Sequence, residues 1–230
     1  MTLTVHHLGV SQSDRVVWLC EELGIDYVLK TYDRAPIMAP DEYKALHTVG
    51  SAPVIEDGAI KLAESGACVE YIAQIYGKGS LVVAPRAKNY ADYLYWFHFG
   101  NGSLVPAFMY NLALRSSGAS PDNEAAKRYK ARLQKLLAFM DQRLEEVPWL
   151  AGDQFTAADI MNVFALTTAR CFYPFDLGEY KNILAYLKRI SEREGYKRAL
   201  QKGDPDLDIN QLTGAAPPPL QKGLAALYKK

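Results

Sequence analysis

Four polar residues stand at the expected starts of two helices. Ser11 and Ser13 separate a short apolar segment from the first run with helical periodicity, and Glu64 and Ser65 precede a second apolar run. A side-chain hydroxyl and the first backbone N–H groups of a helix both attract negative charge at the positive end of the helix dipole. We therefore expect these residues either to bind anions or to do no more than cap their helices.

The first 80 residues predict the elements that would hold these side chains. The segment 14–23 has an apolar helical face and is followed by Gly24, a residue type that commonly ends helices. Asp57-Gly58 predicts a hairpin turn between two apolar segments. The predicted strands are 3–9, 27–32, 52–56 and 59–63, and the predicted helices are 14–23, 41–46 and 65–76. The order βαβ, α, ββα predicts a mixed sheet in a domain at 1–80.

Beyond a linker at 81–86, the sequence pattern is helical. The predicted helices are 87–117, 122–146, 156–170, 177–191 and 192–201. We expect an all-helical second domain at 87–202, so that the fold class is α/β followed by all-α. The composition of 203–230 turns to Asp, Pro, Gly and Gln, which predicts a C-terminal tail that lies on the surface or is partly disordered.

Charge and composition argue against several classes of partner. The chain of 230 residues has 26 basic and 26 acidic residues, so its net charge offers no attraction for nucleic acid. Its apolar runs are shorter than the ~20 residues that a membrane span needs, and its first residues lack the pattern of a signal peptide. We expect a cytoplasmic protein without nucleic-acid or membrane partners.

The cysteine pattern argues against metal and redox sites. Cys20, Cys68 and Cys171 are widely spaced, and each stands among apolar residues. This pattern favours buried reduced thiols, and without a CxxC pair neither zinc binding nor dithiol chemistry has support. We expect no metal. No GxGxxG follows the first predicted strand, which argues against a dinucleotide-binding domain.

Three segments carry a resemblance to a known family. Gly50–Ile55 together with Glu64–Ile72 resembles the glutathione-binding signature of the cytosolic glutathione transferase superfamily. Leu150–Ile160 resembles its C-terminal folding motif, and Ser11–Val16 resembles the start of its first helix. The match is to serine-type members of the bacterial and fungal kind. It implies a thioredoxin-like N-terminal domain, glutathione as co-substrate or cofactor, and a homodimer.

The resemblance places glutathione contacts in the first domain. Pro53 would be cis and would turn the backbone of Val54 toward the cysteinyl unit, which would pair as a short added strand. Glu64 would bind the α-ammonium group, and Ser65 with its helix N-terminus would bind the γ-glutamyl carboxylate. The residues implied at the glycyl end are Ser51 and His47. From the residues alone, a trans proline and a solvated histidine remain alternatives.

The resemblance also implies a serine that favours the thiolate form of glutathione. A free thiol has a pKa near ~8.5, and a hydroxyl at the positive end of a helix stabilises the charged form. Ser11 is the candidate and Ser13 its rival. Ser11 lies four residues before Arg15, whereas several serine-type classes have a spacing of five, the place that Val10 occupies here. The register therefore stays open.

Residues of the second domain predict a pocket for the second substrate. The segment 90–99 is dense in aromatic residues, most of which we expect to pack in the helical core. The resemblance implies that the first long helix of this domain, 87–117, faces the active-site cleft, and Gly100 and Gly102 within it would loosen or bend it. The candidate wall residues are Val10, Asn101, Ser103, Phe108, Tyr110, Phe172 and Tyr173.

A structural motif is predicted at the start of helix 156–170. Thr156 and Asp159 have the spacing of a capping box, with Asp in place of Glu, and Phe155 could pack on Ile160. We expect these residues to stabilise the helix and to take no part in chemistry.

Three functions fit these observations. The first is a glutathione transferase that attacks an electrophilic carbon of a hydrophobic small molecule, in detoxification or secondary metabolism. The second is a cis-trans isomerase that adds the thiolate reversibly to an activated double bond, which needs the same site. The third is a non-catalytic carrier of glutathione or another ligand. Reduction by a catalytic cysteine is disfavoured because Cys20 lies well inside the first predicted helix.

Overall fold

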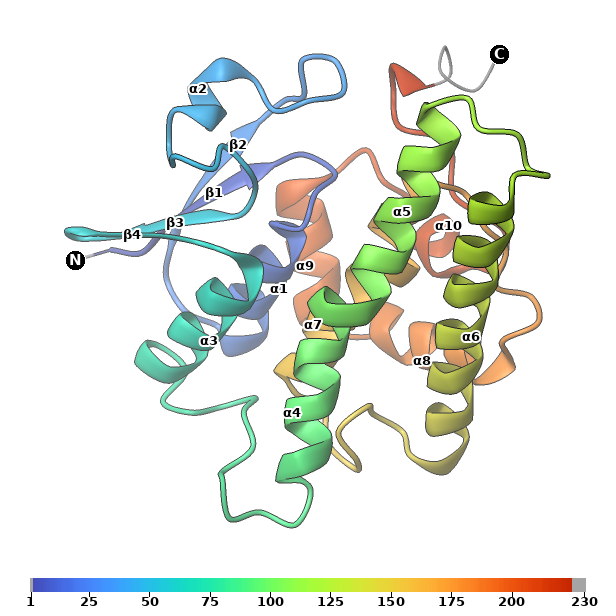
Figure 1. Ribbon diagram of the computed structural model, residues 1–230. Coiled ribbons are helices and arrows are strands. Elements are labelled where there is room, and N and C mark those ends of the chain that lie inside the picture. Colours follow the sequence, from blue (N-terminus) through green and yellow to red (C-terminus); the bar gives the residue numbers. More distant parts are fainter. Residues whose placement is uncertain (1, 225–230) are drawn as a thin grey trace.

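The first part of the chain forms a four-stranded mixed sheet with helices on both faces (Figure 1). In this computed structural model, which describes residues 2–224, the strands are β1 (Thr4–Leu8), β2 (Val28–Tyr32), β3 (Val54–Asp57) and β4 (Ile60–Ala63). Their order is β2-β1-β3-β4, with β1 parallel to β2 and β3 antiparallel to both neighbours. The helices of this part are α1 (Asp14–Leu23), α2 (Asp41–Lys44) and α3 (Ser65–Ile75). The predicted order βαβ, α, ββα is confirmed.

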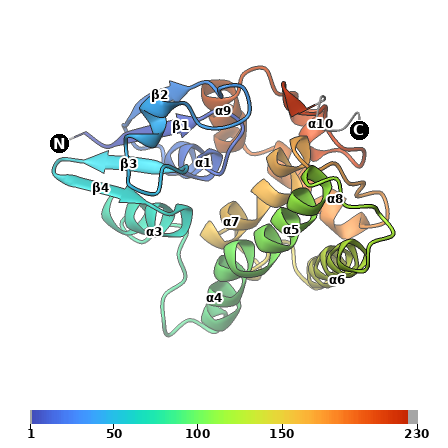
Figure 2. The same cartoon turned by 45° about the horizontal axis from the view of Figure 1, so that its top comes forward.

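The side chains of β1 alternate between the two faces of the sheet. Val5 packs in the main core with side chains of α1 and α3, whereas Leu8 packs with Tyr43 of α2. Successive residues of a strand point to opposite faces. His7 therefore lies on the α1 face and its neighbour His6 on the α2 face, so two buried histidines of one strand have different surroundings. Figures 1 and 2 show α2 on the opposite side of the sheet from α1 and α3.

The second part of the chain is helical, as expected. Its helices are α4 (Tyr90–Phe99), α5 (Val105–Ser116), α6 (Glu124–Glu146), α7 (Ala157–Leu166), α8 (Lys181–Ser191), α9 (Glu194–Gly203) and α10 (Ile209–Thr213). A π-helical turn at Gly100–Leu104 joins α4 to α5, and a 3₁₀ turn at Thr168–Cys171 follows α7. The elements therefore form an N-terminal sheet domain and an all-helical C-terminal domain.

The predicted helix 87–117 begins at Tyr90 and changes its geometry in the middle. A Cβ atom on Gly100 would lie 2.5 Å from the carbonyl oxygen of Met161 in α7. Only glycine allows the backbone of the π-helical turn to lie this close to α7. The same turn carries Asn101, whose amide reaches the N-terminal domain.

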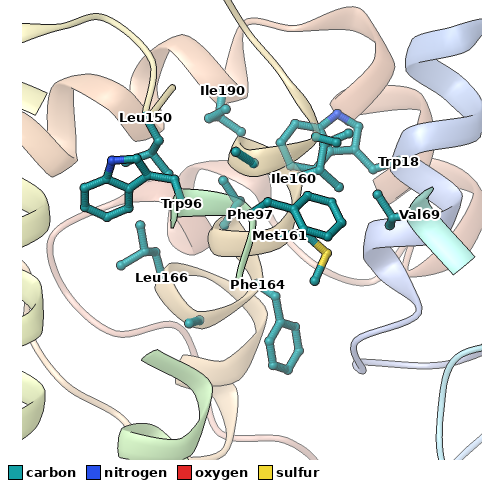
Figure 3. Packing of buried hydrophobic residues seen from close by; sticks show 14 of the residues in the cluster. Trp18, Val69, Trp96, Phe97, Leu150, Ile160, Met161, Phe164, Leu166 and Ile190 are labelled. Carbon is teal, nitrogen blue, oxygen red and sulfur yellow. The ribbon is translucent and has the colours of Figure 1, made fainter. Parts of the chain in front are cut away.

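The hydrophobic core surrounds α7, all ten residues of which are buried. Figure 3 shows Trp18 of α1 and Val69 of α3 beside Ile160 and Met161 of α7. Side chains of both domains thus belong to one closely packed cluster. Such packing resists small displacements, so the core sets the position of each domain relative to the other.

Ion pairs hold α9 along α1. The guanidinium of Arg193 donates to both carboxylate oxygens of Glu22, at 2.8 and 2.7 Å, and Arg198 donates to the Glu21 carboxylate at 3.0 Å. A bidentate pair fixes orientation as well as distance. The end of α9 is consequently positioned at the sheet domain, where Asp204 follows (Figure 2).

The segment 204–224, the described part of the predicted tail, runs along the surface and is held there by a few contacts. Helix α10 buries Leu212, and the guanidinium of Arg170 donates to the carbonyl oxygens of Gly214 at 2.9 Å and Ala215 at 2.7 Å. These contacts are made by backbone carbonyl groups and by single apolar side chains. They therefore leave no periodic pattern of apolar residues in the sequence. The rest of the predicted tail, 225–230, lies outside the described residues.

Asp159 caps its helix and also bonds to two other segments. Its buried carboxylate accepts hydrogen bonds from the N–H of Thr156 at 2.9 Å, the N–H of Leu150 at 3.0 Å and the hydroxyl of Tyr186 at 3.1 Å. The predicted capping box is confirmed. Asp159 thereby joins the start of α7 to the preceding loop and to α8.

We expect Asp159→Ala to lower the free energy of unfolding by about 2–5 kcal/mol, because it removes the cap and leaves two further buried donors unpaired. Urea denaturation measures this change. Asp153→Ala is the matched control, because Asp153 is an exposed aspartate six residues earlier, and it should change the free energy of unfolding by less than about 0.5 kcal/mol. Equal stability of the two variants would contradict the assignment.

Candidate functional site

The turn between β1 and α1 is held from two sides. Val10 has a φ angle of 52°, which β-branched residues rarely adopt. Its N–H donates to Oδ1 of Asp204 at 2.8 Å, and its carbonyl oxygen accepts from the Arg34 guanidinium at 2.7 Å. Arg34 also donates to the carbonyl oxygen of Gly9 at 2.8 Å. These bonds fix the turn that carries Ser11 at the start of α1.

Ser11 is one end of a buried row of polar side chains. Its Oγ lies 2.7 Å from Oγ of Ser13, which lies 2.9 Å from Nδ1 of His7, and Nε2 of His7 lies 3.1 Å from Oδ2 of Asp204. All four residues are at most 9% exposed. Hydrogen bonds are electrostatically stronger in such surroundings than in water. The two rival serines are therefore directly bonded to each other.

Arg15 joins three segments at a second point. Its Nη1 atom lies 2.6 Å from Oε1 of Gln12, 2.8 Å from Oγ of Ser65 and 2.7 Å from Oδ1 of Asn101. Burial lowers the pKa of Arg15 to about 10, so the guanidinium remains charged at neutral pH. One buried cation thus brings the start of α1, the start of α3 and the π-helical turn together.

Ser65 is placed to donate a hydrogen bond outward. Its Oγ accepts from Nη1 of Arg15 and, at 3.0 Å, from Nδ2 of Asn101. A hydroxyl has two acceptor positions and one proton, so these two donors leave the proton for another acceptor. Ser65 is the first residue of α3, and the exposed Glu64 before it has a φ angle of 72°. The hydroxyl and the helix N-terminus together suit an anion.

The Ala52–Pro53 peptide bond is cis, as expected. Val54, which follows it, is fully buried and pairs with His6 of β1 on one side and with Ala63 of β4 on the other. A third strand therefore cannot pair at Val54. The half-buried Ala52 lies just outside β3, at the end of the sheet where the chain enters it.

The two residues expected at the glycyl end lie on the segment between α2 and β3. Ser51 is exposed and directly precedes Ala52. His47 is half-buried, and its Nδ1 accepts from the N–H of Val49 at 3.3 Å. Both side chains are thus near the start of β3, as their sequence position requires.

The candidate pocket residues fall into separate places. Val10 is buried in one cluster with Cys171 and Leu212, and Phe172 packs against this cluster. Phe108 is almost fully buried, and its ring centre is 6.2 Å from that of Tyr173.

The other three candidates have different surroundings. Tyr110 is half exposed and stacks on Tyr129 of α6, with 4.7 Å between ring centres. The half-buried Ser103 stays in the π-helical turn, where Asn101 is bonded to Arg15 and Ser65. The structure thus brings Val10 and Phe172 together and places Tyr110 between α5 and α6.

An open cleft borders the turn between β1 and α1. Its volume is about 790 Å³, within the ~300–1,000 Å³ common for small-molecule sites. Gly9, Val10 and Arg34 line one wall, and the segments 202–208 and 218–222 line another. Of the candidate pocket residues, Val10 is the one in the lining.

His7 and Asp204 received no role from the sequence. They are 197 positions apart, and Asp204 was assigned to the tail. Strand alternation could have placed His7 on the α1 face of the sheet. No local pattern marks Asp204, because its role depends on where α9 ends. Gly203 fits closely there, since a Cβ atom would lie 3.0 Å from Nε2 of His7 and would press on the imidazole ring.

The cysteines are free and buried, as expected. Burial raises the pKa of Cys68 to about 12 and that of Cys171 to about 11. Within residues 2–224, no group of three or more His, Cys, Asp or Glu side chains could hold a metal ion. The helices of this part of the chain are each too short or too polar to cross a membrane.

The chain has a sheet domain of thioredoxin-like topology with a cis proline, followed by an all-helical domain. This combination defines the class of two-domain thioredoxin-fold proteins, and comparisons with known proteins identify the family. The model of the glutathione S-transferase N-terminal domain matches residues 11–75, and that of the C-terminal domain matches residues 99–194. Glutathione S-transferase 3 of Schizosaccharomyces pombe is 30% identical over 212 residues, which covers 87% of each chain. The chain belongs to the glutathione S-transferase superfamily.

Solved structures agree with this assignment. A glutathione S-transferase from Actinobacillus pleuropneumoniae has 32% identity and a TM-score of 0.80, with 91% of this chain and 96% of that chain covered. A family member from Pseudomonas fluorescens with two glutathione molecules bound has 21% identity and a TM-score of 0.72, with 86% and 92% covered. The second comparison concerns the fold alone.

Asp14 is a buried carboxyl group beside the polar row. Its Oδ2 accepts from the Thr168 hydroxyl at 2.8 Å, while Oδ1 has no hydrogen-bond partner among the described residues. Burial, opposed by the charge of Arg15, raises the pKa of Asp14 to about 6.

The raised pKa predicts a pH-dependent stability. Between about pH 6 and pH 4 the folded protein binds a proton at Asp14 that the unfolded chain does not, so lowering the pH through this window stabilises the wild type relative to Asp14→Asn. We expect the difference in free energy of unfolding to change by on the order of 1 kcal/mol or more. Urea denaturation across this range measures it. The exposed Asp122→Asn is the control, and identical pH profiles for all three proteins would contradict the prediction.

Proposed function

We propose that the chain is a glutathione transferase in which the sulfur of glutathione lies at Ser11 as a thiolate and attacks an electrophilic carbon of a hydrophobic small molecule. The observation that carries this proposal is the position of Ser11 in the turn directly before α1, two residues ahead of the N-cap Ser13, with its hydroxyl at the end of a buried row. A hydroxyl hydrogen bond and the positive end of a helix both favour a thiolate over a thiol.

The geometry at Arg15 supports one ligand that spans both helix starts. Gln12, which adjoins Ser11, and Ser65 both contact the same guanidinium nitrogen. An extended tripeptide reaches roughly 10 Å, enough to join two such neighbouring positions. The γ-glutamyl carboxylate then accepts from the Ser65 hydroxyl and the first N–H groups of α3, and Glu64 receives the α-ammonium group.

The middle of the tripeptide pairs with the chain at Ala52 rather than at Val54. Val54 already has a neighbouring strand on both sides, whereas Ala52 lies beyond the end of β3. An extended ligand adds to backbone groups that have no strand beside them. The glycyl end then lies toward Ser51 and His47.

The second substrate lies on the other side of Ser11. Val10 and Phe172 pack in the same cluster next to this turn, and Phe108 and Tyr173 extend the apolar surface within the helical domain. Tyr110 is left out because its ring stacks on α6. The proposal also includes a glutathione-binding domain at 1–80, a substrate-binding domain at 87–202, a homodimer and a cytoplasmic location.

Ser11→Ala should remove the ultraviolet thiolate absorbance of bound glutathione at neutral pH and lower kcat/KM by about 10²-fold or more, because the bond to the sulfur is lost. Cys20→Ala, on the helix that follows Ser11, is the control, since the fully buried Cys20 has no access to substrate. Its activity should equal that of the wild type. Thiolate absorbance that survives in Ser11→Ala would contradict the role of Ser11.

Ser65→Ala should raise the KM for glutathione by about tenfold with a smaller effect on kcat, because a hydrogen bond to a charged group is worth ~1.5–3 kcal/mol. Steady-state kinetics with saturating electrophile separates the two constants. The exposed Ser80→Ala provides the control. An unchanged KM in Ser65→Ala would refute the carboxylate site.

A further inference from the structure

The row from Ser11 to Asp204 contains more than a serine needs in order to bind a sulfur atom. Beyond the two hydroxyls it includes an imidazole and a carboxylate, all of them buried. Ser13 and His7 are separated from any ligand by Ser11, so they can act on a bound thiol only through it.

We propose that His7 receives the proton that the glutathione thiol loses, through Ser13 and Ser11, and that Asp204 stabilises the imidazolium so formed. This inference rests on the proposed function, because it needs the sulfur to lie at Ser11. His7, Ser13 and Asp204 are positioning and proton-accepting residues, and Ser11 is the member of this row that touches the ligand.

Before ionisation, the neutral imidazole fixes the direction of each hydrogen bond. An ionised Asp204 accepts from Nε2–H of His7 at 3.1 Å, so Nδ1 carries a lone pair and accepts from the Ser13 hydroxyl at 2.9 Å. Oγ of Ser13 also accepts from the Leu8 N–H at 3.1 Å and from the Ser11 hydroxyl at 2.7 Å, which fills both of its acceptor positions. Ser11 then presents a lone pair to the thiol.

After the thiol has lost its proton, the Ser13 and Ser11 hydroxyl groups donate in the opposite direction, away from His7 and toward the sulfur. Nδ1–H of His7 donates to Ser13, the Ser13 hydroxyl donates to Ser11, and the Ser11 hydroxyl donates to the sulfur. Ser13 still accepts from Leu8 and Ser11 still accepts from the N–H of Ser13 at 3.2 Å, so every polar atom of the row keeps a partner. The same atomic positions thus allow two fully hydrogen-bonded arrangements that differ in where the proton lies, which is what a proton relay requires.

The step balances as a chain of proton shifts. The thiol proton moves to Oγ of Ser11, the Ser11 proton moves to Oγ of Ser13, and the Ser13 proton moves to Nδ1 of His7. The S–H bond breaks, an N–H bond forms, and the electron pair of the S–H bond stays on the sulfur. No oxidant, reductant or further reactant takes part, and the reverse shift restores the thiol.

Two carboxyl groups lie around the His7 ring. Asp204 faces Nε2, and a cavity of about 20 Å³ beside the ring is lined by Asp14 of α1 and by Thr168 and Tyr196 from the helical domain. The cation Arg34 lies on the far side of the turn, where it bonds to Gly9 and Val10. The carboxylates are therefore the charged groups that line this space, and an opposite charge nearby stabilises an imidazolium.

The proton balance of binding tests this proposal in the unmodified protein. At about pH 7.5 an ordinary thiol is mostly protonated and an ordinary histidine mostly neutral. Calorimetry in buffers of different ionisation enthalpy counts protons released, with S-methylglutathione as the reference ligand that has no thiol. Ultraviolet absorbance counts thiolates formed. We expect thiolate to form with almost no additional proton released, because His7 keeps it. One proton released per thiolate would overturn the relay.

Variants give a second readout. His7→Gln keeps a hydrogen-bonding side chain that cannot take up a proton, and Ser13→Ala interrupts the row. In both, we expect thiolate absorbance to appear only at higher pH and kcat to fall by about 10- to 100-fold, with the KM for glutathione within about threefold. His6→Gln is the matched control, since His6 is equally buried in β1 but points to the α2 face.

The outcomes separate this inference from the proposed function. If Ser11→Ala loses the thiolate while His7→Gln and Ser13→Ala retain it at the wild-type pH, the relay is wrong and the role of Ser11 stands. If Ser11→Ala retains the thiolate, both are wrong. Loss of thiolate in all three variants but not in His6→Gln supports the relay.

Discussion

The carboxylate of Asp204 ties the end of α9 to the turn before α1, and the rest of the site depends on this joint. One oxygen holds the N–H of Val10 in an unfavourable backbone conformation, and the other faces His7. Ion pairs along α1 and α9 determine where α9 ends. The helical domain therefore shapes the part of the sheet domain in which Ser11 lies.

Arg15 makes the second joint between the domains. Its buried charge is shared among Gln12, Ser65 and Asn101, which come from the turn before α1, from α3 and from the π-helical turn. Without the cation, Oε1 of Gln12 and Oδ1 of Asn101 would each lose a charged hydrogen-bond donor. The contacts of Arg15 thus link the starts of α1 and α3 to the helical domain. The close approach of Gly100 to Met161 brings the π-helical turn, and with it Asn101, into reach of Arg15.

Much of the fold could be predicted from local patterns. The apolar face of 14–23, the Asp57-Gly58 turn and the capping box at Thr156 are local features, and the structure has a helix, a hairpin and a cap at those places. The predictions were poorer where distant contacts decide the structure. The predicted helix 87–117 changes to π-helical geometry at Gly100, and no local pattern marks the contact of the Arg170 guanidinium with Gly214.

The order of elements and the starts of α1 and α3, near Ser11 and at Ser65, follow from side-chain periodicity and capping over a few neighbouring residues. The family was indicated by the resemblance of three short segments to known signatures. Only the tertiary structure decided that Ser11 and Ser13 are bonded to each other and continue to His7 and Asp204. The physical reason is that a hydrogen bond across 197 positions requires the packing of α9 on α1, which no local pattern encodes.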